Sequence, residues 1–168
     1  MVPADSRGRF SVSSRANPIM TASFSGSSPP PPLPSHRHSA GPTLVVTRRR
    51  GVVVLRVLGE VDAFNADRLL ALLTQFARRD CASVVDMSGV RFCGVAAVQM
   101  LCAMQQHCEA EGARWALVVG ALVGRLLQLC PVDEALPIEA SVDAALERVR
   151  RAGEIARYLQ LVQATPPD

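Results

Sequence analysis

The chain has 168 residues, 49% of them hydrophobic, with 18 Lys or Arg residues against 15 Asp or Glu residues. Every basic side chain is Arg, which excludes a Walker-type phosphate loop and Schiff-base chemistry, because both need a lysine. The charge is uneven: residues 1–50 hold seven Arg and one Asp, whereas residues 51–168 hold eleven Arg and fourteen acids. The longer, C-terminal part is mildly acidic, and we therefore expect no nucleic-acid partner.

The length suits one domain of ordinary size with a flanking tail, whose core needs neither disulfides nor a metal. Apolar runs at residues 94–104 and 115–124 are too short for a membrane span, and the N-terminus lacks the apolar stretch of a secretory signal. The five cysteines lie in apolar segments and are expected to stay reduced. We therefore expect a cytoplasmic protein that spans no membrane and holds no metal and no cofactor.

Residues 1–42 differ from the rest in composition, with eight of the twelve prolines and ten serines. Such a segment buries too little apolar surface to fold, so we expect a disordered tail. Its composition is also similar to that of a transit peptide, and Met20 is an alternative translation start. The folded domain is expected over residues 43–150, with a C-terminal helical extension and tail over residues 151–168.

The first half of the domain shows both strand and helix patterns. Two β-branched runs, at residues 44–46 and 52–58, flank an Arg-Arg-Arg-Gly segment that is typical of a hairpin turn. Apolar residues at helical spacing predict a helix over residues 65–77, with Asn65 as its N-terminal cap. Residues 83–87 predict a short buried strand, followed by a tight Ser-Gly turn.

The second half alternates helices with strands. A helix is predicted over residues 94–111, because an apolar stripe recurs at helical spacing and Gly112 ends it. The remaining elements are a strand at 115–119, a short helix at 123–129, an edge strand at 137–139 and a helix capped by Ser141 that continues past Gly153. This order predicts an α/β sandwich, with a mixed, mostly parallel sheet, an opening hairpin and helices packed on one side.

Three segments carry the motifs of a known family. Residues 57–62 read Val-Leu-Gly-Glu-Val-Asp, residues 84–92 read Val-Val-Asp-Met-Ser-Gly-Val-Arg-Phe, and residues 116–129 join a strand to a short helix. In this order they resemble the STAS domain family, which includes the anti-sigma factor antagonists, over about residues 43–150. The resemblance implies a STAS-like fold and a non-catalytic role in transcription regulation. In that role the unphosphorylated domain binds an anti-sigma factor that is also a serine kinase.

The sequence departs from the family at the residues that carry the family's switch. The kinase of such a system phosphorylates a serine in an Asp-Ser-Ser-Gly turn, and the added charge breaks the complex. Val95 stands at this phosphoacceptor position and has no hydroxyl, so the usual phosphorylation cannot occur. The resemblance thus implies a domain that binds its anti-sigma factor without this switch. The implied partner-binding residues are Asp62, Asn65, Cys93, Gly94, Val95, Ala96, Ala97 and Val98.

Other functions stay open at this point. A ligand- or nucleotide-sensing STAS module would hold its ligand near the same helix start, and a diverged scaffold component would have another partner. An α/β enzyme is least expected, because the domain has one histidine, His107, and no motif nucleophile. The helix end would favour a thiolate at Cys93, but a partly buried, inert thiol is the preferred interpretation. The sequence leaves the oligomeric state open.

Overall fold

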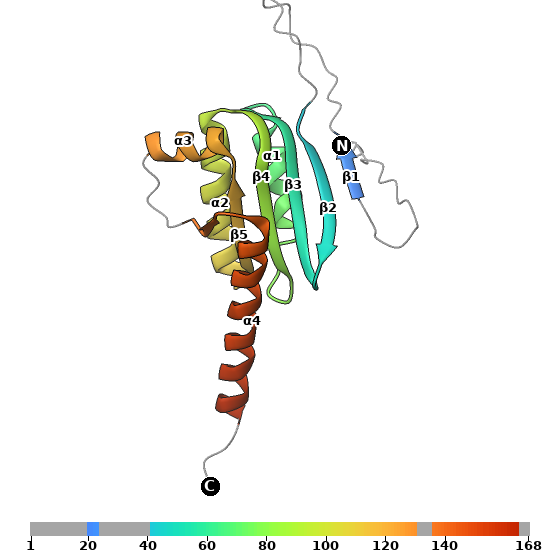
Figure 1. The fold of residues 1–168 in the computed structure, drawn as a ribbon, viewed down its shortest axis with the longest axis vertical. Coiled ribbons are helices and arrows are strands. Elements are labelled where there is room, and N and C mark those ends of the chain that lie inside the picture. The colour runs from blue at the N-terminus through green and yellow to red at the C-terminus, as the bar shows by residue number, and fades with distance from the viewer. Residues whose placement is uncertain (1–19, 24–40, 131–135, 165–168) are drawn as a thin grey trace, which may run out of the picture.

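The computed structural model describes residues 20–23, 41–130 and 136–164, which form one sheet and four helices (Figure 1). The strands are β1 (Met20–Ser23), β2 (Thr43–Arg49), β3 (Val52–Val61), β4 (Ala82–Cys93), β5 (Arg114–Val119) and β6 (Ile138–Glu139). The helices are α1 (Ala66–Thr74), α2 (Val95–Glu111), α3 (Ala121–Leu129) and α4 (Val142–Ala164). The six strands lie in chain order across the sheet. β2 is antiparallel to both β1 and β3, and β3 to β6 run parallel.

The predicted hairpin between β2 and β3 is confirmed. Arg49 pairs with Val52 across a two-residue turn, in which Arg50 and Gly51 have φ values of 51° and 82°. Two consecutive residues with positive φ make a type I′ turn, whose twist matches that of the strands it joins. The hairpin places three arginines at the opposite end of β3 from Val61.

Strand β4 is longer than the sequence predicts. The predicted turn at Ser88 and Gly89 is wrong, because both residues continue the strand, which runs to Cys93. The pairing of β4 with β3 shifts register twice in this stretch, so that extra residues of β4 bulge out of the ladder. A buried strand is identified in a sequence by a continuous apolar run, and here that buried run ends at Met87. Beyond it the bulges leave buried and exposed residues in no regular order.

Helices cover both faces of the sheet. The α/β class and the mostly parallel sheet are confirmed, but the expectation that all helices pack on one side is wrong. In Figure 1, α4 crosses one face while α1 and α2 lie behind the other. Central parallel strands bury both faces, so each face needs a cover. One core joins Leu55, Met87 and Leu117 of the sheet to Leu69, Leu101 and Val123 of α1, α2 and α3. The other joins Val54, Val84 and Val118 to Leu146 and Val149 of α4.

The helices follow the sequence pattern with one difference. Helix α1 ends at Thr74, short of the predicted residue 77, although Ala77 is still buried in the core. Helix α4 continues past Gly153 to Ala164, as the sequence predicts. Ser141 caps α4 as predicted, because its Oγ accepts the N–H of Ala144 at 3.2 Å.

The N-terminal segment contains one described element. Strand β1 lies within residues 1–42, where the sequence predicts a disordered tail, and it pairs with β2 along the sheet edge. The rest of that prediction, over residues 1–19 and 24–40, lies outside the described residues.

Candidate functional site

The ends of β3 and β4 bring the predicted site residues together. Val61 and Cys93 are partners in the parallel ladder, and the N–H of Gly94 donates to the carbonyl of Val61 at 2.9 Å. A Cβ on Gly94 would lie 4.0 Å from the Cα of Asp62. The loop that precedes α1 therefore adjoins the start of α2, and we call residues 62–65 and 93–98 together the α2 N-terminal surface.

Asp62 and Asn65 hold the loop before α1 in a fixed turn. Oδ1 of Asp62 accepts the N–H of Phe64 at 2.9 Å, and Oδ1 of Asn65 accepts the N–H of Asp62 at 3.1 Å. Nδ2 of Asn65 donates to the carbonyl of Glu60 at 3.2 Å. Asn65 precedes α1 as predicted, but its side chain makes no capping bond to the helix. Both predicted contact residues thus act within the turn.

The first turn of α2 presents one side chain to solvent. Val95 is 59% exposed, whereas Cys93, Gly94 and Ala96 are half-buried. Ala97 and Val98 are buried in the core, so they contribute packing rather than exposed surface. Gly94 occupies the N-cap position with an extended backbone.

Three exposed hydrophobic residues at this end of the molecule are absent from the sequence-based site. Phe64 lies in the turn before α1, Phe92 in the last residues of β4, and Leu122 in the first turn of α3. Their pattern gives no signal of exposure, because an apolar residue beside a strand or in a helix usually packs into the core.

The thiol of Cys93 is poorly suited to redox chemistry. Burial, together with the nearby Cys130, raises the pKa of Cys93 to about 11. The thiol form is therefore favoured over the thiolate at this helix end, which agrees with the inert thiol expected from the sequence. No disulfide joins the five cysteines, all of which lie in the described part.

A buried carboxylate lies on the α4 side of the sheet. Oδ1 of Asp86 accepts the hydroxyl of Ser88 at 2.6 Å, and Oδ2 accepts Nε of Arg56 at 2.8 Å. Ser88 also donates its N–H to Oδ1 at 3.0 Å. Both oxygens of this carboxylate accept hydrogen bonds from structural partners, which makes Asp86 a stabilising residue of the sheet.

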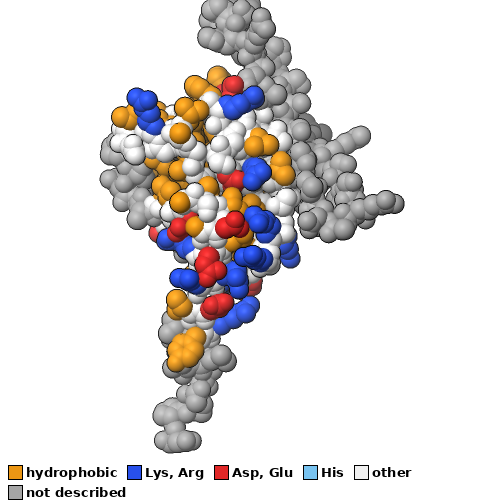
Figure 2. Space-filling model, in the orientation of Figure 1, with side chains coloured by type: hydrophobic (Ala, Val, Ile, Leu, Met, Phe, Trp, Pro, Cys, Tyr) orange, Lys and Arg blue, Asp and Glu red, His pale blue; other side chains and the backbone are white. Residues whose placement is uncertain are grey.

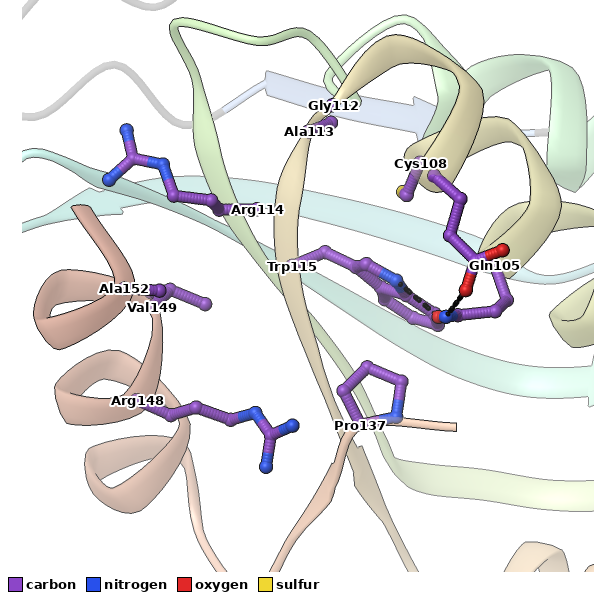
Figure 3. A pocket seen from close by; sticks show the side chains of 11 residues that line it. Gln105, Cys108, Gly112, Ala113, Arg114, Trp115, Pro137, Arg148, Val149 and Ala152 are labelled. Carbon is purple, nitrogen blue, oxygen red and sulfur yellow. Dashed lines mark hydrogen bonds between the residues drawn. The ribbon is translucent and has the colours of Figure 1, made fainter. Parts of the chain in front are cut away.

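A shallow cavity of about 280 Å³ lies at the other end of α2, between that helix, β5 and α4 (Figure 3). Nε1 of Trp115 donates to Oε1 of Gln105 at 2.9 Å, and Nε2 of Gln105 donates to Glu109 at 2.6 Å. Arg148 points across the cavity toward Pro137. The cavity does not lie near the start of α2, where the sequence would place a ligand.

Charged side chains gather along α4 on the face shown in Figure 2. They include ion pairs such as Arg151 with Glu147 at 2.9 Å and Arg49 with Asp143 at 3.4 Å. Among residues 20–23, 41–130 and 136–164, no helix has the length and apolar character that a membrane crossing requires. The same residues contain no group of three His, Cys, Asp or Glu side chains placed to hold a metal.

The STAS domain family matches residues 43–145, which is most of the described chain. The chain belongs to the STAS domain family. This match covers the C-terminal ends of β3 and β4, the turn before α1 and the start of α2. The α2 N-terminal surface is therefore part of the STAS domain itself.

Two relatives and one solved structure similar to this STAS domain come from mycobacteria. Osmosensory protein A of Mycobacterium tuberculosis (strain ATCC 25618 / H37Rv) is 32% identical over 113 residues, which are 65% of this chain and 70% of the relative. Anti-sigma-F factor antagonist RsfA of the same species is 30% identical over 98 residues, 56% of this chain and 77% of the relative. The crystal structure of an anti-sigma factor antagonist from Mycobacterium paratuberculosis is 28% identical, with a TM-score of 0.56, and the alignment covers 66% of this chain and 95% of that one.

Proposed function

We propose that this STAS domain is an anti-sigma factor antagonist that binds a kinase-type anti-sigma factor through the α2 N-terminal surface and is not phosphorylated there. The observation that carries the proposal is the exposed first residue of α2, Val95, which offers an apolar side chain and no hydroxyl. The protein acts by binding, without chemistry of its own.

Three observations support an anti-sigma factor as the partner. A relative and a solved structure similar to this chain are named anti-sigma factor antagonists. The α2 N-terminal surface lies at one end of the sheet, away from the charged side chains along α4. It contains the exposed side chains of Phe64 and Val95, and exposed Phe92 directly precedes it in the chain. Exposed apolar side chains in a group are typical of protein interfaces.

The missing hydroxyl changes how such a complex would be controlled. A phosphate adds about −1.5 to −2 charges, which a helix N-terminus tolerates but an apposed protein surface rejects. Because Val95 cannot accept a phosphoryl group, ATP should leave this complex intact. The amount of antagonist in the cell would then set how much anti-sigma factor is sequestered.

The test uses the full chain as bait in a lysate of the source cells and identifies captured proteins by mass spectrometry. The captured anti-sigma factor is then purified and titrated against the chain with and without ATP and Mg²⁺. We expect the same affinity in both conditions and no phosphate on the chain. A complex that ATP dissociates, or a phosphorylated serine or threonine anywhere in the chain, would contradict the proposal.

A second candidate function, favoured by the cavity beside Trp115, is binding of a small molecule. Arg114 and Arg148 line this cavity together with Glu109, and Arg148 pairs with Glu139 at 3.0 Å, so a polar ligand of mixed charge, such as a nucleotide with its base and phosphates, is the class to test. Trp115 is the chain's single tryptophan, and its fluorescence reports on occupancy. A saturable fluorescence change on titration with ATP or GTP would support this function, and an unchanged spectrum would exclude it for these nucleotides.

A further inference from the structure

The ring of Phe64 lies almost wholly in water. It is 95% exposed, more than the other large hydrophobic side chains that the described residues expose. A phenylalanine that packs into an interface buries roughly 150–250 Å² of surface. This ring therefore contributes nothing to the core of its own domain, and it is available in full to a binding partner.

The turn that carries Phe64 is fixed before any partner binds. Its own N–H is held by the Asp62 carboxylate, and the Asn65 side chain ties the turn to Asp62 and Glu60. The N–H of Ala66 also donates to the carbonyl of Asp62 at 2.9 Å. A side chain on a preorganised turn loses little entropy on binding, which is typical of residues that dominate an interface.

Phe64 and Val95 belong to adjoining segments of little charge. The two segments meet through the bond from Gly94 to Val61, and Gly94 comes close to Asp62. Across residues 62–65 and 93–98, Asp62 is the only charged residue, and its Oδ1 is engaged by the N–H of Phe64. An apolar site on the partner is the complement of the exposed side chains of Phe64 and Val95.

We infer that Phe64 is the anchor of the anti-sigma factor complex and inserts into an apolar pocket of the anti-sigma factor beside the contact made by Val95. Asp62 and Asn65 are then positioning residues that aim the ring. This inference rests on the proposed function, because it specifies the contact through which that function operates.

The first experiment compares the affinity of the full chain for the purified anti-sigma factor with that of Phe64→Ala. Truncation of an anchor costs at least about thirtyfold in affinity. Tyr158→Ala is the matched control, because Tyr158 is also a mostly exposed aromatic residue but lies on α4. We expect the control to bind as the wild type does, and circular dichroism to show that both variants keep their fold.

A second experiment separates positioning from mere stability. Asn65→Ala removes the bonds to Asp62 and Glu60 and should weaken binding several-fold by freeing the turn. In a Phe64→Ala background the same change should have no further effect, because there is no ring left to aim. Equal losses from Asn65→Ala in both backgrounds would overturn the positioning role.

The outcomes distinguish this inference from the function on which it rests. Strong binding by the wild type and weak binding by Phe64→Ala support both. Equal binding by the wild type and Phe64→Ala overturns the anchor and leaves the proposed function standing. A wild-type chain that does not bind the anti-sigma factor overturns both.

Discussion

Nε of Arg56 on β3 donates to Oδ2 of Asp86 on the adjacent parallel strand β4 at 2.8 Å. The Arg56 side chain is about half exposed, whereas the Asp86 carboxylate is buried. Asp86→Asn keeps the shape of this side chain but removes its charge. The loss of a charge-assisted bond to a buried partner should lower the free energy of unfolding by about 2 kcal/mol, as measured by urea denaturation. Asp143→Asn is the control, because its pair with Arg49 is exposed on both sides and should contribute less than about 0.5 kcal/mol. Equal effects of the two changes would contradict this account.

The same carboxylate predicts how stability depends on acid. Burial by itself would raise the pKa of Asp86, but the hydroxyl and N–H of Ser88 and the guanidinium of Arg56 hold that pKa below its ordinary value. Below about pH 4 the unfolded chain therefore takes up a proton that the folded chain does not, and acid favours unfolding. This contribution is complete above the ordinary pKa and is lost as the pH falls through the lower, folded pKa. Urea denaturation between about pH 5 and pH 2 should show a smaller loss of stability for Asp86→Asn than for the wild type.

Gly120 lies where the backbone of β4 leaves no room for a side chain. A Cβ there would lie 2.9 Å from the carbonyl oxygen of Ser88 and 3.2 Å from its Cα. Gly120→Ala should therefore destabilise the fold by about 1–3 kcal/mol, because a strand backbone cannot move aside as a side chain can. Gly124→Ala, inside α3 with its nearest neighbour a side-chain atom at 3.7 Å, should instead add about 0.5–1 kcal/mol. Thermal denaturation should therefore show a lower Tm than the wild type for Gly120→Ala and a higher Tm for Gly124→Ala.

Most of the fold could be predicted because its strands and helices have regular patterns. The second half of β4 could not, because the continuous buried run ends at Met87 and the bulges beyond it leave no regular order of buried and exposed residues. The face that α4 covers could not be predicted either. Its apolar stripe, with Leu146 and Val149, shows that the helix buries one side but does not say against which face of the sheet.

The proximity of the candidate site residues could be predicted from the sequence, but their individual contacts could not. The motif residues follow two strands that are neighbours in a parallel sheet, which is enough to bring the turn before α1 next to the start of α2. The sequence could not show that the Asn65 side chain donates to the carbonyl of Glu60 and does not cap α1. An asparagine at this position is suited to either hydrogen bond. Nor could the sequence show that Phe64 is exposed, because exposure depends on how the turn directs the ring.

The thiol of Cys93 should react slowly with alkylating agents. Its pKa of about 11, raised by burial and then by Cys130, leaves almost no thiolate at neutral pH. The rate of reaction with iodoacetamide, followed by peptide mass spectrometry, should keep rising up to about pH 11 in the folded chain. In urea the pH dependence of the reaction rate should have the midpoint of an ordinary cysteine, about pH 8.5. A folded midpoint near that value would show that burial does not disfavour the thiolate of Cys93.

Val95→Asp places a charge at the residue that the sequence resemblance aligns with the family's phosphorylated serine, and it should separate binding from folding. Val95 is the first residue of α2 and is mostly exposed, so an aspartate there suits the helix dipole and should leave the thermal stability unchanged or slightly higher. Against an apolar partner surface the same charge loses its water without gaining a partner, which should weaken the anti-sigma factor complex by about a hundredfold or more. Val95→Thr, of similar volume and uncharged, should bind within about threefold of the wild type when ATP is absent. A folded Val95→Asp variant with wild-type affinity in isothermal titration would place the interface elsewhere on the domain.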